Sequence, residues 1–146
     1  MLDAVSESTA PAGSQPTRSS AQTRRVAAID IGTNSTHLLV ASVDTTLGTF
    51  SIEQAEKSTT RLGERDPDSG ELTSAGMQRG YETLRRFRDL AISHDVEQIV
   101  TAATSAVREA PNGREFLQSI QDGLGMDVDL VSGPEEARLI YLGVLS

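Results

Sequence analysis

The segment Val26–Val43, with the sequence VAAIDIGTNSTHLLVASV, decides the fold of this chain. A short apolar run ends at Asp30, and Gly32 with the two residues after it is typical of a turn. The next run, Leu38–Val43, is apolar in both alternating sets of positions, which predicts a strand covered on both faces. The segment therefore predicts two strands joined by a short polar turn.

A third strand is expected directly after this segment. Residues 45–48 have the composition of a turn, and Phe50 and Ile52 then fall on one face of an extended chain. Three successive strands with short connections predict an antiparallel meander. Residues 62–72, which contain two Asp residues, a Pro and a Gly, are expected to form a loop.

Helical periodicity begins at Thr73. An apolar stripe recurs at helical spacing and predicts the buried face of a helix: Met77, Tyr81, Leu84, Phe87 and Leu90/Ala91. Four arginines lie mostly outside this stripe and are expected to form a solvated face: Arg79, Arg85, Arg86 and Arg88.

The remaining sequence alternates strands and helices. Residues 96–103 and 128–131 predict strands, and a helix between them is expected to start at Asn112, in a capping box with Glu115, and to stop at Gly125. A last helix is expected from Ser132, and its apolar stripe is still running when the sequence ends, which predicts a helix that has been cut. The order βββαβαβα predicts an α/β domain with a mixed sheet.

Composition bounds the possible functions. The 146 residues suit one domain, and residues 1–23 are rich in Ser, Thr, Ala and Pro, which predicts a disordered tail before a domain over residues 24–146. The absence of cysteine excludes disulfide scaffolds and thiol chemistry. The formal charge of −8 argues against nucleic-acid binding. Neither a membrane span nor a signal peptide is present, so we expect no membrane partner and a cytoplasmic location.

Three clusters of residues are candidates for a functional site. In the first, Asp30 ends a buried strand and is followed by Gly32-Thr33-Asn34-Ser35. Successive amide N–H groups in a tight turn form an anion-binding concavity, and the carboxylate suits a hydrated Mg²⁺. An ordinary hairpin turn is the alternative interpretation.

The second cluster, Thr104-Ser105-Ala106-Val107-Arg108, lies where a strand gives way to a helix. Ligands of open α/β sheets bind at such strand ends, and the Arg108 guanidinium suits a phosphate group. The alternative is a surface ion pair between Arg108 and Glu109.

The third cluster is the start of the last helix, where two glutamates are adjacent. Glu135 has the spacing of a capping box with Ser132, whereas Glu136 has no such structural duty. Glu136 is therefore the better candidate for a general base that faces a cleft.

Together and in this order, four motifs resemble the exopolyphosphatase/guanosine pentaphosphate phosphohydrolase (Ppx/GppA) family of phosphatases, within the actin-like ATPase superfamily. They are DIGTNS at 30–35, RLGE at 61–64, TSAVREAPNG at 104–113 and SGPEEARLIYLGV at 132–144. The resemblance covers residues 26–145. Members of the family continue into a second phosphate loop, so the chain resembles the first of two actin-like (ribonuclease H-like) domains.

The resemblance implies a role for each matching residue. Asp30 would lie near a divalent cation such as Mg²⁺, the turn of Gly32, Thr33, Asn34 and Ser35 would bind phosphate with Arg108, and Glu136 would activate the attacking water. Thr33 stands where many members have Ser.

The implied reaction is release of the terminal phosphate of inorganic polyphosphate by metal-assisted attack of water. The alternatives are a guanosine pentaphosphate phosphohydrolase and, less favoured, a sugar kinase or actin-like ATPase domain, or an inactive fragment. The parent enzyme is expected to form a homodimer, and the 146-residue chain to be inactive alone and prone to association.

Overall fold

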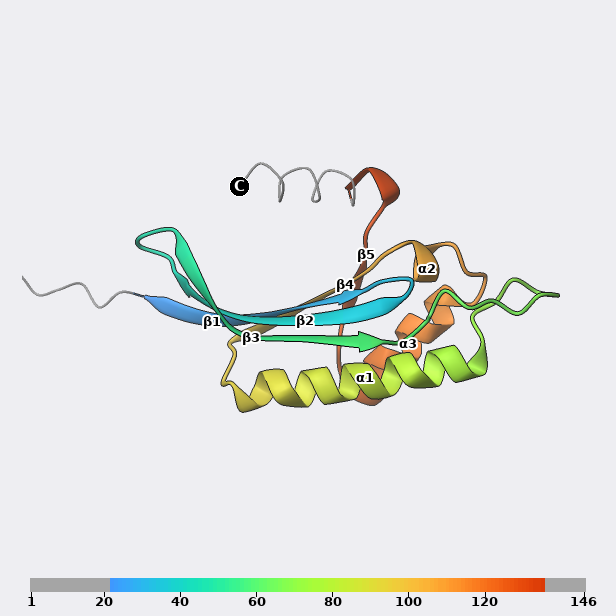
Figure 1. The fold of residues 1–146 in the computed structure, drawn as a ribbon, viewed down its shortest axis with the longest axis horizontal. Helices are drawn as coiled ribbons and strands as arrows, with labels where there is room; N and C mark the ends of the chain where they lie inside the picture. The colour runs from blue at the N-terminus through green and yellow to red at the C-terminus, as the bar shows by residue number, and fades with distance from the viewer. Residues whose placement is uncertain (1–21, 136–146) are drawn as a thin grey trace, which may run out of the picture.

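The computed structural model describes residues 22–135. This part of the chain forms a mixed sheet with helices, as Figure 1 shows. The elements, in chain order, are β1 (Thr23–Ile31), β2 (Ser35–Asp44), β3 (Thr49–Thr59), α1 (Ser74–Ser93), β4 (Gln98–Ala103), α2 (Ser105–Arg108), α3 (Gly113–Leu124) and β5 (Val128–Leu130).

The sheet has the strand order β3-β2-β1-β4-β5. Strands β1, β2 and β3 are joined as antiparallel neighbours, whereas β4 pairs with β1, and β5 with β4, in parallel. The predicted meander, the helical crossovers and the α/β class are therefore confirmed. The short helix α2 is an addition to the predicted order.

Both long helices lie on the same face of the sheet (Figure 1). The side chains of β1 alternate accordingly, because Ala27, Ile29 and Ile31 are buried while Ala28 and Asp30 are exposed. The covered face forms one core with Leu84 and Phe87 of α1 and Phe116 and Ile120 of α3. For the described part of the chain, the expectation that the second strand is covered on both faces is wrong, since no described helix packs on the other face.

The expected pairing of Phe50 and Ile52 on one face is confirmed. Phe50 lies opposite Val43 and Ile52 opposite Ala41, next to a bulge in the β2–β3 ladder. Both side chains are largely exposed, at 67% and 58%. They belong to the face that α1 and α3 leave open.

The two long helices start in different ways. Thr73 caps α1 by accepting a hydrogen bond from the Gly76 N–H at 3.0 Å. Asn112, however, makes no side-chain cap of α3. Its amide instead accepts from the Leu72 N–H at 2.8 Å and donates to the Leu72 carbonyl at 3.1 Å. The predicted capping box is therefore wrong, because the buried Asn112 ties α3 to the end of the 62–72 loop.

One residue of the expected tail belongs to the sheet. Thr23 is part of β1, where it pairs with Asp44. The rest of the expected tail, residues 1–21, lies outside the described residues, as does the helix from Glu136 onward. Between residues 22 and 135, no helix is long and apolar enough to span a membrane.

Candidate phosphate site

The ends of three parallel strands meet at one edge of the sheet. Ile31 of β1 is in register with Ala103 of β4, which is in register with Leu130 of β5. Hydrogen bonds continue beyond the strands, from the Thr104 N–H to the Ile31 carbonyl at 3.2 Å and from the Val131 N–H to the Ala103 carbonyl at 2.9 Å. The three sequence clusters follow these strand ends, so the fold brings them to a common edge, where open α/β sheets bind ligands.

The turn between β1 and β2 is closed by its own backbone. The Gly32 N–H donates to the Ser35 carbonyl at 3.0 Å, and a Cβ at Gly32 would lie 2.8 Å from that oxygen. Thr33 and Asn34 are exposed, and their N–H groups donate to no acceptor among residues 22–135. The segment is thus a hairpin turn, as the alternative interpretation had it, and it also offers the amide donors that an anion requires.

A second loop, residues 60–65 after β3, lies against this turn. The Gly63 N–H donates to the Thr33 carbonyl at 2.8 Å, and the Arg61 N–H donates to the Asn34 carbonyl at 2.9 Å. A Cβ at Gly63 would lie only 2.3 Å from the methyl group of Thr33. The RLGE motif therefore holds the turn in place, and its glycine permits the close approach.

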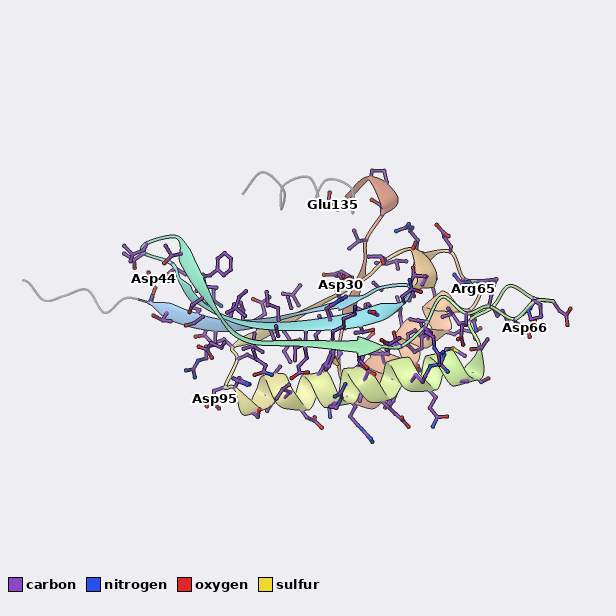
Figure 2. All side chains as sticks on the ribbon, in the orientation of Figure 1. Asp30, Asp44, Arg65, Asp66, Asp95 and Glu135 are labelled. Carbon is purple, nitrogen blue, oxygen red and sulfur yellow. The ribbon has the colours of Figure 1, made fainter. Side chains whose placement is uncertain are left out.

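Asp30 lies on the face of the sheet away from α1, as Figure 2 shows. Its cross-strand neighbour on β2 is His37, and its neighbour on β4 is Ala102. The described ranges contain no group of three or more metal-ligating side chains. Mg²⁺ is commonly held by one or two carboxylates with waters and substrate phosphates, so an exposed carboxylate beside the turn of residues 32–35 fits that ion.

Helix α2 contacts both the turn and the second loop. The Ser105 hydroxyl lies 3.3 Å from the Thr33 hydroxyl. On the other side, Arg65 donates from Nη2 to the Ala106 carbonyl at 2.6 Å, while its Nη1 is buried without a partner in the described part. Arg65 therefore fixes α2 relative to the second loop.

Arg108 links α2 to the segment after β5. Its Nη1 donates to the Val131 carbonyl at 2.5 Å, and its Nη2 lies 3.7 Å from Glu109 Oε1. The ion pair with Glu109, which was the alternative interpretation, is thus present. Arg108 also lies beside Gly133, since a Cβ there would be 3.8 Å from Nη2. The guanidinium is anchored at the site edge, next to the start of the last helix.

The third cluster is described only up to Glu135. The Ser132 hydroxyl accepts a hydrogen bond from the Glu135 N–H at 3.3 Å, as expected of a helix cap. Figure 2 shows Glu135 on the same side of the sheet as Asp30. Glu136, the expected general base, lies outside the described residues, and its role stays a prediction.

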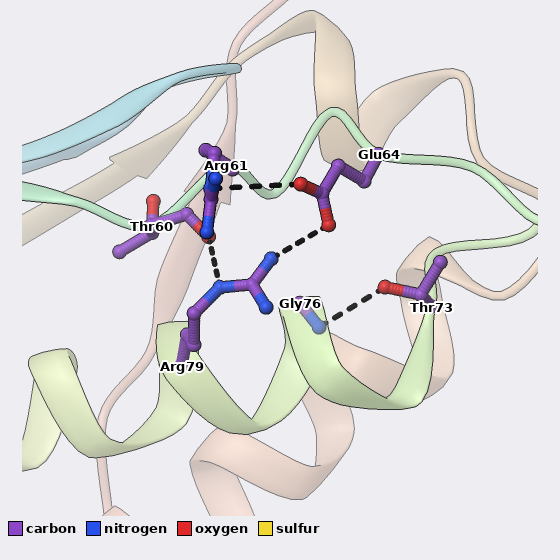
Figure 3. Close-up of polar contacts among 6 residues, drawn as sticks. All are labelled: Thr60, Arg61, Glu64, Thr73, Gly76 and Arg79. Carbon is purple, nitrogen blue, oxygen red and sulfur yellow. Dashed lines mark hydrogen bonds and ion pairs between the residues drawn. The ribbon is translucent and has the colours of Figure 1, made fainter.

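Arg79 lies in a different environment from the one its place in the sequence predicted. It was expected on the solvated face of α1, but Nε donates to the Thr60 carbonyl and Nη2 to Glu64 Oε2, both at 2.8 Å (Figure 3). Arg79 thereby fastens the loop that holds the turn. The RLGE motif of this loop was part of the family resemblance, but no periodicity in the sequence indicated that Arg79 contacts the loop.

Comparison with known proteins supports the motif analysis. The family model described as the Ppx/GppA phosphatase family matches residues 39–146. Exopolyphosphatase 1 of Mycobacterium tuberculosis is 34% identical over 121 residues, which are 82% of this chain and 35% of that protein. The chain thus spans about a third of the length of the curated relatives it matches.

Solved structures agree. The crystal structure of the Aquifex aeolicus family member matches with a TM-score of 0.77 and 31% identity, over 84% of this chain and 39% of that one. An exopolyphosphatase from Cytophaga hutchinsonii matches with a TM-score of 0.77 and 33% identity, over 83% of this chain and 38% of that one. The motifs, the sheet topology and these similarities agree, and the chain belongs to the Ppx/GppA phosphatase family.

Proposed function

We propose that the protein contributes the first half of a site that hydrolyses the terminal phosphoanhydride bond of inorganic polyphosphate. The observation that carries this proposal is the meeting of the 30–35 turn, α2 and residues 131–135 at one edge of the sheet. The similarity to proteins named exopolyphosphatase supports the substrate class. Because the chain spans about a third of such relatives, the activity is proposed for the full-length gene product.

The turn supplies the first set of phosphate contacts. The N–H groups of Thr33 and Asn34 are the donors proposed for the phosphoryl oxygens, with the Ser35 hydroxyl beside them. Their carbonyls are already engaged by the second loop, so the turn does not need to rearrange to present these donors. Preorganised donors stabilise the charge that develops on the transferred group.

Arg108 and Glu136 are the residues proposed to act on the phosphate chain and on the attacking water. Arg108 would contact a phosphoryl oxygen from its anchored position between α2 and Val131. Glu136 would accept a proton from water as the water oxygen attacks the terminal phosphorus. The bond from that phosphorus to the bridging oxygen breaks, and the shortened polyphosphate leaves with the bonding electron pair.

Asp30 is the residue proposed to hold a divalent cation such as Mg²⁺. When bound, the ion would offset the negative charge of the phosphate chain. The exposed position of Asp30 next to the turn supports this assignment.

The experiment measures phosphate release by the full-length gene product from long-chain polyphosphate and from guanosine pentaphosphate. Glu136→Gln is expected to lower kcat by about 10²–10⁴-fold with little change in KM, because it removes the base and leaves the phosphate contacts. Glu135→Gln is the matched control and is expected to spare kcat. Faster release from guanosine pentaphosphate than from polyphosphate would replace the proposed substrate, and an active Glu136→Gln with an inactive Glu135→Gln would reassign the base.

A further inference from the structure

The second loop, which follows β3, brings the backbone of a second arginine, Arg61, against the turn of residues 32–35. The backbone of Arg61 is fixed by its N–H bond to the Asn34 carbonyl at 2.9 Å. Its φ of 48° lies in the left-handed region, which a non-glycine residue adopts at an energetic cost. The surrounding hydrogen bonds therefore hold Arg61 in an unfavourable conformation beside the turn.

The side chain of Arg61 is held more weakly than its backbone. It is 61% exposed, and its Nε lies 3.5 Å from Glu64 Oε1. The other carboxylate oxygen of Glu64 accepts the shorter bond from Arg79, at 2.8 Å (Figure 3). Arg79 is itself fixed by its bond to the Thr60 carbonyl. Glu64 is thus bound mainly by Arg79.

The charges of this group do not cancel. Two guanidinium groups, Arg61 and Arg79, share the single carboxylate of Glu64, so the three side chains carry a net charge of +1. This positive charge lies beside the turn of a chain whose formal charge is −8. Because Arg79 offsets Glu64, the charge of Arg61 is available to an incoming anion.

We propose that Arg61 is an additional contact for the phosphate chain, and that Arg79 acts through Glu64 as a positioning residue. Resting on the proposed function of the turn, this inference adds a cation on the second loop, which contacts both the turn and α2. When a phosphate chain arrives, Arg61 exchanges the long contact with Glu64 for a charge-assisted bond to a phosphoryl oxygen. Glu64 keeps its bond to Arg79, so no carboxylate is left without a cation.

The test is calorimetric binding of inorganic tripolyphosphate to the 146-residue chain at low ionic strength. Arg61→Gln is expected to weaken binding by about five- to tenfold, and Arg61→Lys to retain most of the affinity, because the charge is the main requirement. Arg85→Gln, an exposed arginine of α1, is the matched control and is expected to change the affinity by less than about twofold.

Arg79→Gln distinguishes positioning from a merely structural role. With Arg79 neutral, Glu64 pairs with Arg61 and competes with the anion, so binding is expected to weaken by about threefold. Adding Glu64→Gln to that variant removes the competitor and is expected to restore the affinity. If Arg79 only stabilises the loop, the double variant will bind no better than Arg79→Gln.

Two outcomes overturn the inference in distinguishable ways. Binding by Arg61→Gln that equals the binding by the unmodified chain removes Arg61 from the site and leaves the proposed phosphate turn intact. If the unmodified chain does not bind tripolyphosphate, the turn is not an anion site, and the proposed role of Arg61 is refuted as well. Thermal unfolding of each variant, compared with that of the unmodified chain, confirms that the comparison is made on folded protein.

Discussion

The two faces of the central sheet carry similar apolar residues but differ in burial. On the face covered by α1 and α3, Ile29 and Ile31 are 2% and 0% exposed. On the opposite face, Val100 and Ile52 are 45% and 58% exposed. Hydrophobicity alone therefore does not locate the core of this chain. The core lies where the side chains of the strands face α1 and α3. Asp30 faces the other way and is therefore accessible.

Substitutions on the covered face are expected to destabilise the protein most. Ile29→Ala is expected to lower the free energy of unfolding by about 2–5 kcal/mol, because it removes buried methyl groups and leaves a cavity. Val100→Ala, on the open face, is expected to cost less than about 1 kcal/mol. Urea denaturation of both variants measures the difference. Equal losses would show that the two faces are equally well packed in solution.

A polar substitution within the covered layer is expected to have the next largest effect. Asn112→Ala removes both hydrogen bonds to Leu72 and leaves buried backbone groups unsatisfied, which costs about 1–3 kcal/mol. Gln118→Ala removes only an exposed contact with Asp122 one helical turn away and is expected to cost about 0.5 kcal/mol or less. Faster hydrogen exchange at the Leu72 amide identifies the site of the loss. An unchanged exchange rate in Asn112→Ala would contradict the tie.

On the open face, substitution is expected to alter association more than stability. Ile52→Ser is expected to change the free energy of unfolding by about 0.5 kcal/mol or less, because the side chain is already exposed. It is also expected to reduce self-association and dye binding by shrinking an exposed apolar surface. Sedimentation velocity and unfolding curves measure the two effects separately. A stability loss as large as that of Ile29→Ala would show that this face is buried in solution.

The smallest effect concerns a loop that neither face covers. The backbone N–H groups of Ser69 and Asp68 donate to the Asp66 carboxylate and lower its pKa. A lowered pKa stabilises the folded loop above the ordinary pKa of an aspartate, and this contribution is lost as the pH falls through the lowered value. Because these hydrogen bonds lie in an exposed surface loop, the effect on overall stability is small. An NMR titration in which Asp66 protonates at the ordinary pKa would contradict these hydrogen bonds.

Local sequence patterns predicted most of the elements. Alternation, turn residues and helical periodicity located the meander, α1, α3 and β5, and Gly125 ends α3 in the left-handed conformation as expected. Those signals act between near neighbours in the chain. The role of Asn112 could not be predicted in this way, because its partner Leu72 is forty positions away and a cap fits the same residue type.

The sequence predicted the clusters that form the candidate site but not the residues that hold them in place. The three clusters at strand ends were identified from turn chemistry and family motifs, and parallel pairing brings them together. Arg65 and Arg79 were missed because an arginine that ties a loop to a helix has the same sequence pattern as one that faces solvent. Only the three-dimensional path of the second loop shows which arginines bind it and which face solvent.

The close approach of Gly63 to Thr33 has a consequence for how the family varies. The atom nearest to a Cβ at position 63 is the methyl group of Thr33, at 2.3 Å, while the next two lie at 3.2 and 3.5 Å. A serine at position 33 lacks this methyl group, so an alanine at position 63 would then meet first the backbone oxygen of residue 33, at 3.2 Å. The two positions are therefore expected to covary among homologues, with threonine at the first requiring glycine at the second. The substitution Gly63→Ala is accordingly expected to be less disruptive where position 33 is serine than where it is threonine.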